Sequence, residues 1–116
     1  IYTPEEWVRQ HILHYLVEDL EFTTSSIALE VPIPINGMRK RADIVVYQQA
    51  QPYIMVECKA PNITISQATF DQIARYNIVL GSHFLMVSNG LNHFYCQMDF
   101  EQKRYHFLKE LPKKNE

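Results

Sequence analysis

The stretch IMVECKAP, residues 54–61, begins like a buried strand and then places two charges on one face. Its first three residues are apolar and typical of a strand interior. Glu57 and Lys59 follow, two positions apart. Because strand side chains alternate between the two faces of a sheet, both charges project to the same side, about 6.7 Å apart along the strand. A carboxylate and an ammonium at the end of a core strand therefore require an explanation, structural or chemical.

The segment before this strand, residues 27–47, predicts a β-hairpin. Asn36-Gly37 is a favoured pair for a two-residue type I′ turn, in which both positions need a positive φ. Pro32 and Pro34 cannot donate hydrogen bonds to a ladder, so we expect the first arm to lie at the edge of the sheet.

The rest of the chain predicts two helices and further strands. Residues 3–20 form an amphipathic pattern with Thr3 as N-cap, and residues 67–80 predict a second helix between a Ser66 cap and Gly81. Besides the arm at 41–48, strands are expected at 53–59, at 83–88 and 92–99, which meet at Asn89-Gly90, and briefly at 104–108. The order α-β-β-β-α-β-β predicts an α/β fold with a mixed sheet flanked by helices, in which the second helix connects two parallel strands.

The length and composition favour one domain. A chain of 116 residues can bury one core but not two, and 47% hydrophobic with 21% charged residues is ordinary for a globular protein. No apolar run approaches the roughly 20 residues that cross a bilayer, and no signal peptide is visible. We expect no membrane association. Because the chain begins with Ile, we expect a fragment of a longer protein, with a polar tail at 109–116.

The cysteines and the net charge indicate the redox compartment and the class of partner. Cys58 and Cys96 have no metal-ligand spacing, which favours a reduced, cytoplasmic protein. A net charge of -2 argues against a strongly basic nucleic-acid binder that acts alone. One basic cluster, Arg39-Lys40-Arg41, immediately precedes the second hairpin arm.

Asp43 completes a candidate site with Glu57 and Lys59. An antiparallel return over the intervening turn brings Glu57 back beside Asp43. Two carboxylates suit Mg²⁺, which takes oxygen ligands and retains several waters, and a lysine can stabilise charge on a reacting phosphate. The alternative is a structural ion pair of Lys59 with Asp43 or Glu57 at the rim of the sheet.

These residues also match the motif of a known protein family. RAD (41–43) and VECKAP (56–61), after an acidic first helix, resemble the PD-(D/E)XK nuclease superfamily, with Ala42 in place of its proline. Nearly the whole chain is similar to the N-terminal nuclease domain of type I restriction enzyme R subunits, through TPEEWVRQHILHYL, NGMRKRADIVVY, FDQIARYN and SNGLNHFYC. The resemblance implies a restriction-endonuclease-like αβββαβ core that cleaves DNA with Mg²⁺, for which Mn²⁺ can substitute. Asp43, Glu57 and the Cys58 carbonyl would bind the metal, and Lys59 would be catalytic.

Further residues are candidates for supporting roles. Gln72 and Tyr76 match the QxxxY element of some superfamily members and share a helix face, although a surface glutamine and a core tyrosine would show the same pattern. The superfamily also uses an acid from its first helix, for which helix periodicity favours Glu5 over Glu6. Arg9 suits a phosphate contact or a salt bridge. Candidate contacts to the DNA backbone are Arg39, Lys40, Arg41 and Arg75.

Two functions are compatible with the sequence. The first is a metal-dependent deoxyribonuclease that works with motor, specificity or methylation subunits and, for a double-strand cut, as a possible homodimer. The second is a non-catalytic module that binds nucleic acid or protein on the same fold. The five histidines show no zinc spacing, and with three glycines the chain has no phosphate-binding loop of a motor. Ser88-Asn89-Gly90 is expected to be a turn with no base beside it.

Overall fold

Six strands form one mixed sheet in the computed structural model, which describes residues 3–114. The strands follow one another across the sheet in chain order. The elements are α1 (Pro4–His14), the π-helical turn η1 (Tyr15–Asp19), the 3-10 turn η2 (Thr24–Ser26), β1 (Ile27–Ile33), β2 (Lys40–Gln48), β3 (Gln51–Cys58), α2 (Gln67–Leu80), β4 (Phe84–Ser88), β5 (His93–Asp99) and β6 (Arg104–Leu108).

The predicted strand polarity is confirmed. β3 and β4 are parallel and are joined by α2, whereas the other neighbouring strands are antiparallel. β1 lies at one edge of the sheet, as expected from Pro32 within it and Pro34 just after it. The carboxyl end of β3, with Glu57 and the Lys59 that follows it, therefore lies in the interior of the sheet between β2 and β4.

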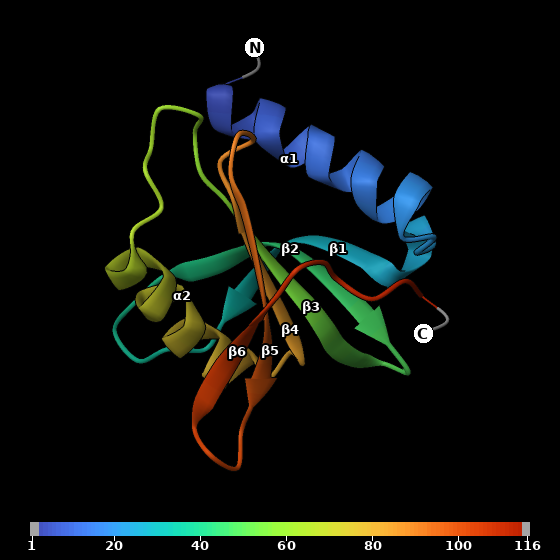
Figure 1. Cartoon of the computed structure of the whole chain (residues 1–116). Helices are drawn as coiled ribbons and strands as arrows, with labels where there is room; N and C mark the ends of the chain where they lie inside the picture. Colours follow the sequence, from blue (N-terminus) through green and yellow to red (C-terminus); the bar gives the residue numbers. More distant parts are fainter. Residues whose placement is uncertain (1–2, 115–116) are drawn as a thin grey trace.

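α1 and α2 cover opposite faces of the sheet (Figure 1). Alternation on β3 separates the two cores, since Ile54 and Val56 pack with α1 and η1 whereas Met55 packs with α2. The Cys58 thiol lies in the α1 core, on the opposite side of the sheet from Glu57. No helix within residues 3–114 combines the length and apolar character needed to span a membrane.

The helix boundaries follow their capping residues. Thr3 accepts a hydrogen bond from the Glu6 amide, and Ser66 accepts one from the Thr69 amide. Gly81 ends α2 with a φ of 84°. The predicted first helix, 3–20, is α-helical only to His14 and then widens into η1, which sequence periodicity does not reveal.

The hairpin turns differ from the prediction. The Asn36-Gly37 pair lies at the centre of the β1–β2 connection, but only Gly37 has a positive φ, 74°, and the Met38 amide bonds the Ile35 carbonyl, as in a type II turn. The type I′ prediction was wrong for this hairpin. The two-residue turn with both φ values positive is Gln49-Ala50, between β2 and β3, with φ of 53° and 61°.

The predicted polar tail is partly folded. Leu111 is buried in the α1 core, and the Lys114 amide donates to the Leu20 carbonyl over 2.9 Å. Residues 115 and 116 of the predicted tail lie outside the described residues. The segment after β6 therefore covers part of the α1 core.

Gly90, in the β4–β5 turn, fixes the approach of α1. Its φ is 88°, and a Cβ there would lie 3.1 Å from side-chain atoms of both Trp7 and Val8. Gly37 has a similar φ but open space around the Cβ position. We expect Gly90→Ala to lower the free energy of unfolding by about 3 kcal/mol, and Gly37→Ala by about 1 kcal/mol. Urea unfolding of both variants measures the difference, and equal losses would contradict the contact with α1.

Candidate active site

β2 and β3 separate at the point where the charged residues lie. Their pairing ends at Ile44–Val56, although β2 begins four residues earlier and β3 continues to Cys58. The alternation of β2 also breaks here, because Ala42 packs in the α2 core and Ile44 in the α1 core. Beside this break, Glu30 of β1 has a φ of 51°. The distortion opens a gap between two central strands.

Asp43 lies in this gap and replaces a ladder acceptor. Its Oδ2 accepts a hydrogen bond from the Cys58 amide at 2.7 Å. The amide would otherwise be left without a partner at the end of the ladder, which is costly inside a protein. The side chain of Asp43 is thereby oriented by the fold itself.

Glu57 is buried beside Asp43 and is incompletely paired. It is 2% exposed, its Oε2 forms an ion pair with Lys40, and its Oε1 has no hydrogen-bond partner. Burial and, next in size, the negative charge of Asp43 together raise the pKa of Glu57 to about 7, against the opposing effect of Lys40. An additional cation would relieve this carboxylate pair.

Lys40 connects the acid to α2. Its Nζ lies 5.2 Å from the centre of the Tyr76 ring, and the Tyr76 hydroxyl accepts a hydrogen bond from Gln72 Nε2 at 3.0 Å. Gln72 is exposed and Tyr76 is half-buried. The two predicted QxxxY residues therefore share one helix face and meet Glu57 through Lys40.

The first turn of α1 borders the same gap. Glu5, Glu6, Arg9 and Asp43 line a cleft of about 400 Å³. Arg9 and Gln10 engage Glu6, with an Arg9–Glu6 distance of 2.7 Å, and these hydrogen bonds lower the pKa of Glu6. Arg9 is therefore a salt-bridge partner of Glu6. Glu5, unlike Glu6, has no such ion pair with Arg9.

Lys59 follows directly after β3. Its amide donates to the Ser88 carbonyl at 2.8 Å, and among residues 3–114 its half-buried side chain forms no ion pair. The alternative of a structural pair with Asp43 or Glu57 is wrong, because Lys40 occupies that position. Sequence reasoning missed this role of Lys40. Strict alternation from Ile44 would place Lys40 on the opposite face from Glu57, and only the break in alternation brings the two side chains together.

The β4–β5 turn supports the end of β3. The prediction that no base lies near Ser88 was wrong, because β5 places His93 Nδ1 2.6 Å from the Ser88 hydroxyl. Ser88 is fully buried, and its hydroxyl also accepts from the Gly90 amide. Asn89 bonds the Ile63 carbonyl at 2.8 Å, which ties the loop after Lys59 to this turn. These contacts hold the turn closed.

The arrangement fits a divalent cation in donor chemistry but offers few side-chain ligands. Within residues 3–114, no group of three or more His, Cys, Asp or Glu side chains is placed to hold a metal ion. The two carboxylates Asp43 and Glu57 are adjacent, and one buried oxygen has no partner. Mg²⁺ commonly uses one or two carboxylates and completes its shell with water and substrate oxygens.

Comparison with known proteins identifies the family. The family model "Type I restriction enzyme R protein N terminus" matches residues 4–112. The chain belongs to this family. A structure described as a fragment of an HsdR subunit of a type I restriction enzyme from Vibrio vulnificus YJ016 has the same fold, with a TM-score of 0.67 and 21% identity over 97% of this chain. The present chain spans 24% of that chain. No curated protein sequence matches the present chain significantly.

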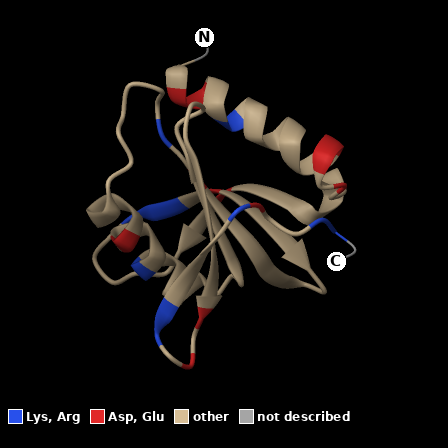
Figure 2. Ribbon diagram, in the orientation of Figure 1, with Lys and Arg blue, Asp and Glu red and all other residues tan. Residues whose placement is uncertain are grey.

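The predicted resemblance to R-protein N termini is thereby confirmed. The basic candidates of this R-protein N-terminal domain lie in two places. Arg39 and Arg41 are exposed at the start of β2, coloured blue in Figure 2, next to the half-buried Lys40. Arg75 is exposed on α2 and lines a different cavity.

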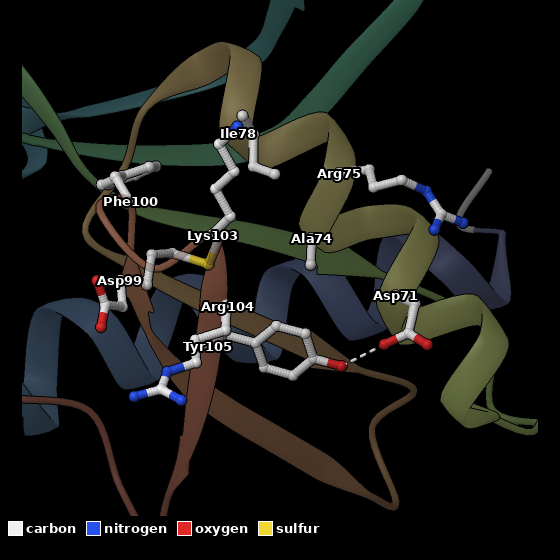
Figure 3. Close-up of a pocket in the computed structure, with 10 residues that line it drawn as sticks. Asp71, Ala74, Arg75, Ile78, Asp99, Phe100, Lys103, Arg104 and Tyr105 are labelled. Atoms are coloured by element: carbon white, nitrogen blue, oxygen red, sulfur yellow. Dashed lines mark hydrogen bonds between the residues drawn. The ribbon is translucent and has the colours of Figure 1, made fainter.

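That cavity, of about 680 Å³, is larger than the cleft at α1 (Figure 3). It lies between α2 and the β5–β6 hairpin, where the Tyr105 hydroxyl bonds Asp71. Its lining includes neither Asp43 nor Glu57. A search for the functional site by cavity size alone would therefore miss the paired carboxylates.

The raised pKa of Glu57 predicts a pH-dependent stability. Between about 4.5, the ordinary pKa, and about 7, the folded protein retains a proton that the unfolded chain has released. With metal removed by chelator, the free energy of unfolding should therefore fall as pH rises through this window, by about 1–3 kcal/mol from this group. Urea unfolding of wild type and Glu57→Gln isolates it, since the fall should be absent in the variant. Parallel pH profiles would contradict the prediction.

Proposed function

We propose that this domain is a metal-dependent nuclease of the PD-(D/E)XK type that hydrolyses phosphodiester bonds in DNA. The observation that supports it most is Glu57, a buried carboxylate with one unpaired oxygen, placed beside Asp43 where two strands separate. A carboxylate pair of this kind lowers the stability of the metal-free fold. Such a cost is typical of a functional site.

Asp43, Glu57 and the Cys58 carbonyl are the proposed metal ligands. The Cys58 amide points at Asp43, and in an extended strand the carbonyl of a residue faces the same side as its amide. When bound there, Mg²⁺ or Mn²⁺ would polarise a phosphate oxygen and lower the pKa of a bound water. The family membership supports this assignment, because the family is named for restriction enzymes.

Other residues have proposed roles around these ligands. Lys59 stabilises negative charge that develops on the phosphate, and Glu5 supplies a further acid from the cleft at α1. Tyr76, oriented by its hydrogen bond with Gln72, positions the Lys40 ammonium beside the site. Contacts to the DNA backbone are proposed for Arg39, Lys40, Arg41 and Arg75, and their binding would be independent of sequence and weakened by salt.

The domain is proposed to act within a larger restriction system. The similar Vibrio vulnificus structure is about four times as long as this chain. A motor and partner subunits for specificity or methylation would act together with this domain. A double-strand break requires two such sites. A transient pair of domains on DNA would provide them.

Plasmid nicking with Mg²⁺ or Mn²⁺ over a range of salt concentrations tests the proposal. We expect metal-dependent conversion of supercoiled to nicked DNA and a rise in melting temperature with Mn²⁺ alone. If the isolated domain needs its motor, nicking will be absent but the Mn²⁺ effect will remain. Absence of both effects would contradict the metal site.

A non-catalytic binding module is the second candidate. The small number of ligating side chains within residues 3–114 favours it. Such a module would bind DNA without any metal dependence, so a gel-shift assay in chelator and in Mn²⁺ distinguishes the two functions. Equal affinity in both conditions, with no Mn²⁺ effect on melting, would favour the module.

A further inference from the structure

Lys40 occupies the position next to Glu57 that the nuclease proposal reserves for a metal. Resting on that proposed function, we infer that Lys40 is a displaceable occupant of the site. It neutralises Glu57 while no divalent cation is bound. When a cation binds, Lys40 leaves Glu57 for a DNA phosphate, which makes metal binding and DNA binding cooperative.

The geometry of the pair supports displacement. Among the ion pairs of residues 3–114, Glu57 has Lys40 as its partner, and the two belong to strands that no longer pair at this level. The Glu57 side chain is 3% exposed whereas that of Lys40 is 23% exposed. The carboxylate is therefore fixed in the protein, while the ammonium on its flexible stem can reach solvent without crossing the core.

A bound divalent cation and the ammonium would compete for the same carboxylate. Lys40 uses Oε2 of Glu57, and the free Oε1 offers a first contact for an incoming cation. Two cations held at one carboxylate also repel each other. The stronger charge of the divalent ion would therefore favour release of Lys40.

The surroundings of Lys40 indicate where it goes. The Tyr76 ring lies 5.2 Å from the Lys40 Nζ, and Gln72 donates a hydrogen bond to the Tyr76 hydroxyl. The aromatic ring can therefore stabilise the ammonium by a cation–π contact while it moves away from Glu57. Exposed Arg39 and Arg41 flank Lys40 in sequence. A third cation released beside them would add to a phosphate-binding surface.

The inference requires reciprocal coupling. If metal frees Lys40 for a phosphate, DNA that binds Lys40 must also free Glu57 for the metal, by the same factor. This coupling separates Lys40 from a cation that only contacts DNA. It also separates Lys40 from one that only stabilises the fold.

Isothermal titration of Mn²⁺ at pH 8, with and without a short phosphorothioate DNA duplex, measures the coupling. For Lys40→Met without DNA we expect about tenfold tighter Mn²⁺ binding than for wild type, because no ammonium must be displaced. The duplex should tighten Mn²⁺ binding by wild type and have little effect in the variant. Lys103→Met removes an equal charge away from the carboxylate pair and should bind Mn²⁺ like wild type. If Lys40→Met fails to fold, Lys40→Gln retains a hydrogen-bond donor without the charge.

The outcomes separate this inference from the proposed function. If wild type binds Mn²⁺, Asp43→Asn does not, and Lys40→Met binds Mn²⁺ no tighter than wild type, the displacement is wrong although the metal site stands. If Lys40→Met and Lys103→Met tighten Mn²⁺ binding equally, the effect is one of net charge and the displacement is again wrong. If none of the proteins binds Mn²⁺, the metal site itself is wrong and the inference fails with it.

Discussion

Asp43→Asn and Glu57→Gln are each expected to lower metal-dependent DNA cleavage by at least about 10³-fold. Each change removes one of two adjacent carboxylates from the gap between β2 and β3. The fold should survive both. An asparagine oxygen can still accept the hydrogen bond of the Cys58 amide, and a neutral side chain at 57 relieves a buried charge.

Isosteric variants are needed for this experiment. Asp43→Ala would leave the Cys58 amide without its acceptor and cost about 1–3 kcal/mol, so a loss of cleavage in that variant could reflect the fold. Initial nicking rates should be compared at pH 8 together with melting temperatures. Cleavage by either isosteric variant at more than a tenth of the wild-type rate would exclude that residue as a metal ligand.

Lys59→Met is expected to lower the cleavage rate by about 10²–10³-fold with little change in stability. The lysine forms no ion pair within residues 3–114, and the contact between residue 59 and Ser88 uses the backbone, which the substitution retains. Mn²⁺ affinity should also be nearly unchanged, because the side chain is proposed to act on the phosphate and not on the metal.

Lys103→Met is the matched control for Lys59→Met. Lys103 lines the cavity beside the β5–β6 hairpin, away from the carboxylate pair, and carries the same charge. Its variant should cleave like wild type. Comparable losses in both variants would show that net charge, and not the position after β3, determines the rate.

The arrangement of the carboxylates was predictable because it depends on local rules. Alternation and an antiparallel return are sufficient to bring Asp43 and Glu57 together. The short turn that sets this return was predicted, but its left-handed conformation at Gln49-Ala50 was not, because neither residue is typical of positive φ. The favoured pair, Asn36-Gly37, instead forms a turn with one positive φ beside Pro34.

The pairing of the lysines could not be predicted in the same way. Motif spacing suggests that the positively charged neighbour of Glu57 is Lys59, two residues along the chain. In the structure this neighbour is Lys40, on the other side of the gap. The break in alternation at Asp43 is a tertiary effect of the separating strands, with Glu30 in a left-handed conformation beside it. A long, flexible side chain adds a further freedom that no periodicity describes.

The hydrogen bond between Asp43 and the Cys58 amide affects how relatives of this chain should be judged. An acid or amide at position 43 completes the sheet and would be retained by selection for folding even after catalysis was lost. Glu57 offers the metal-free fold no comparable benefit, since it is buried with an unpaired oxygen. In an evolutionary survey, the residue at position 57 is therefore the better marker of an active nuclease, and retention of Asp43 alone is weak evidence for activity.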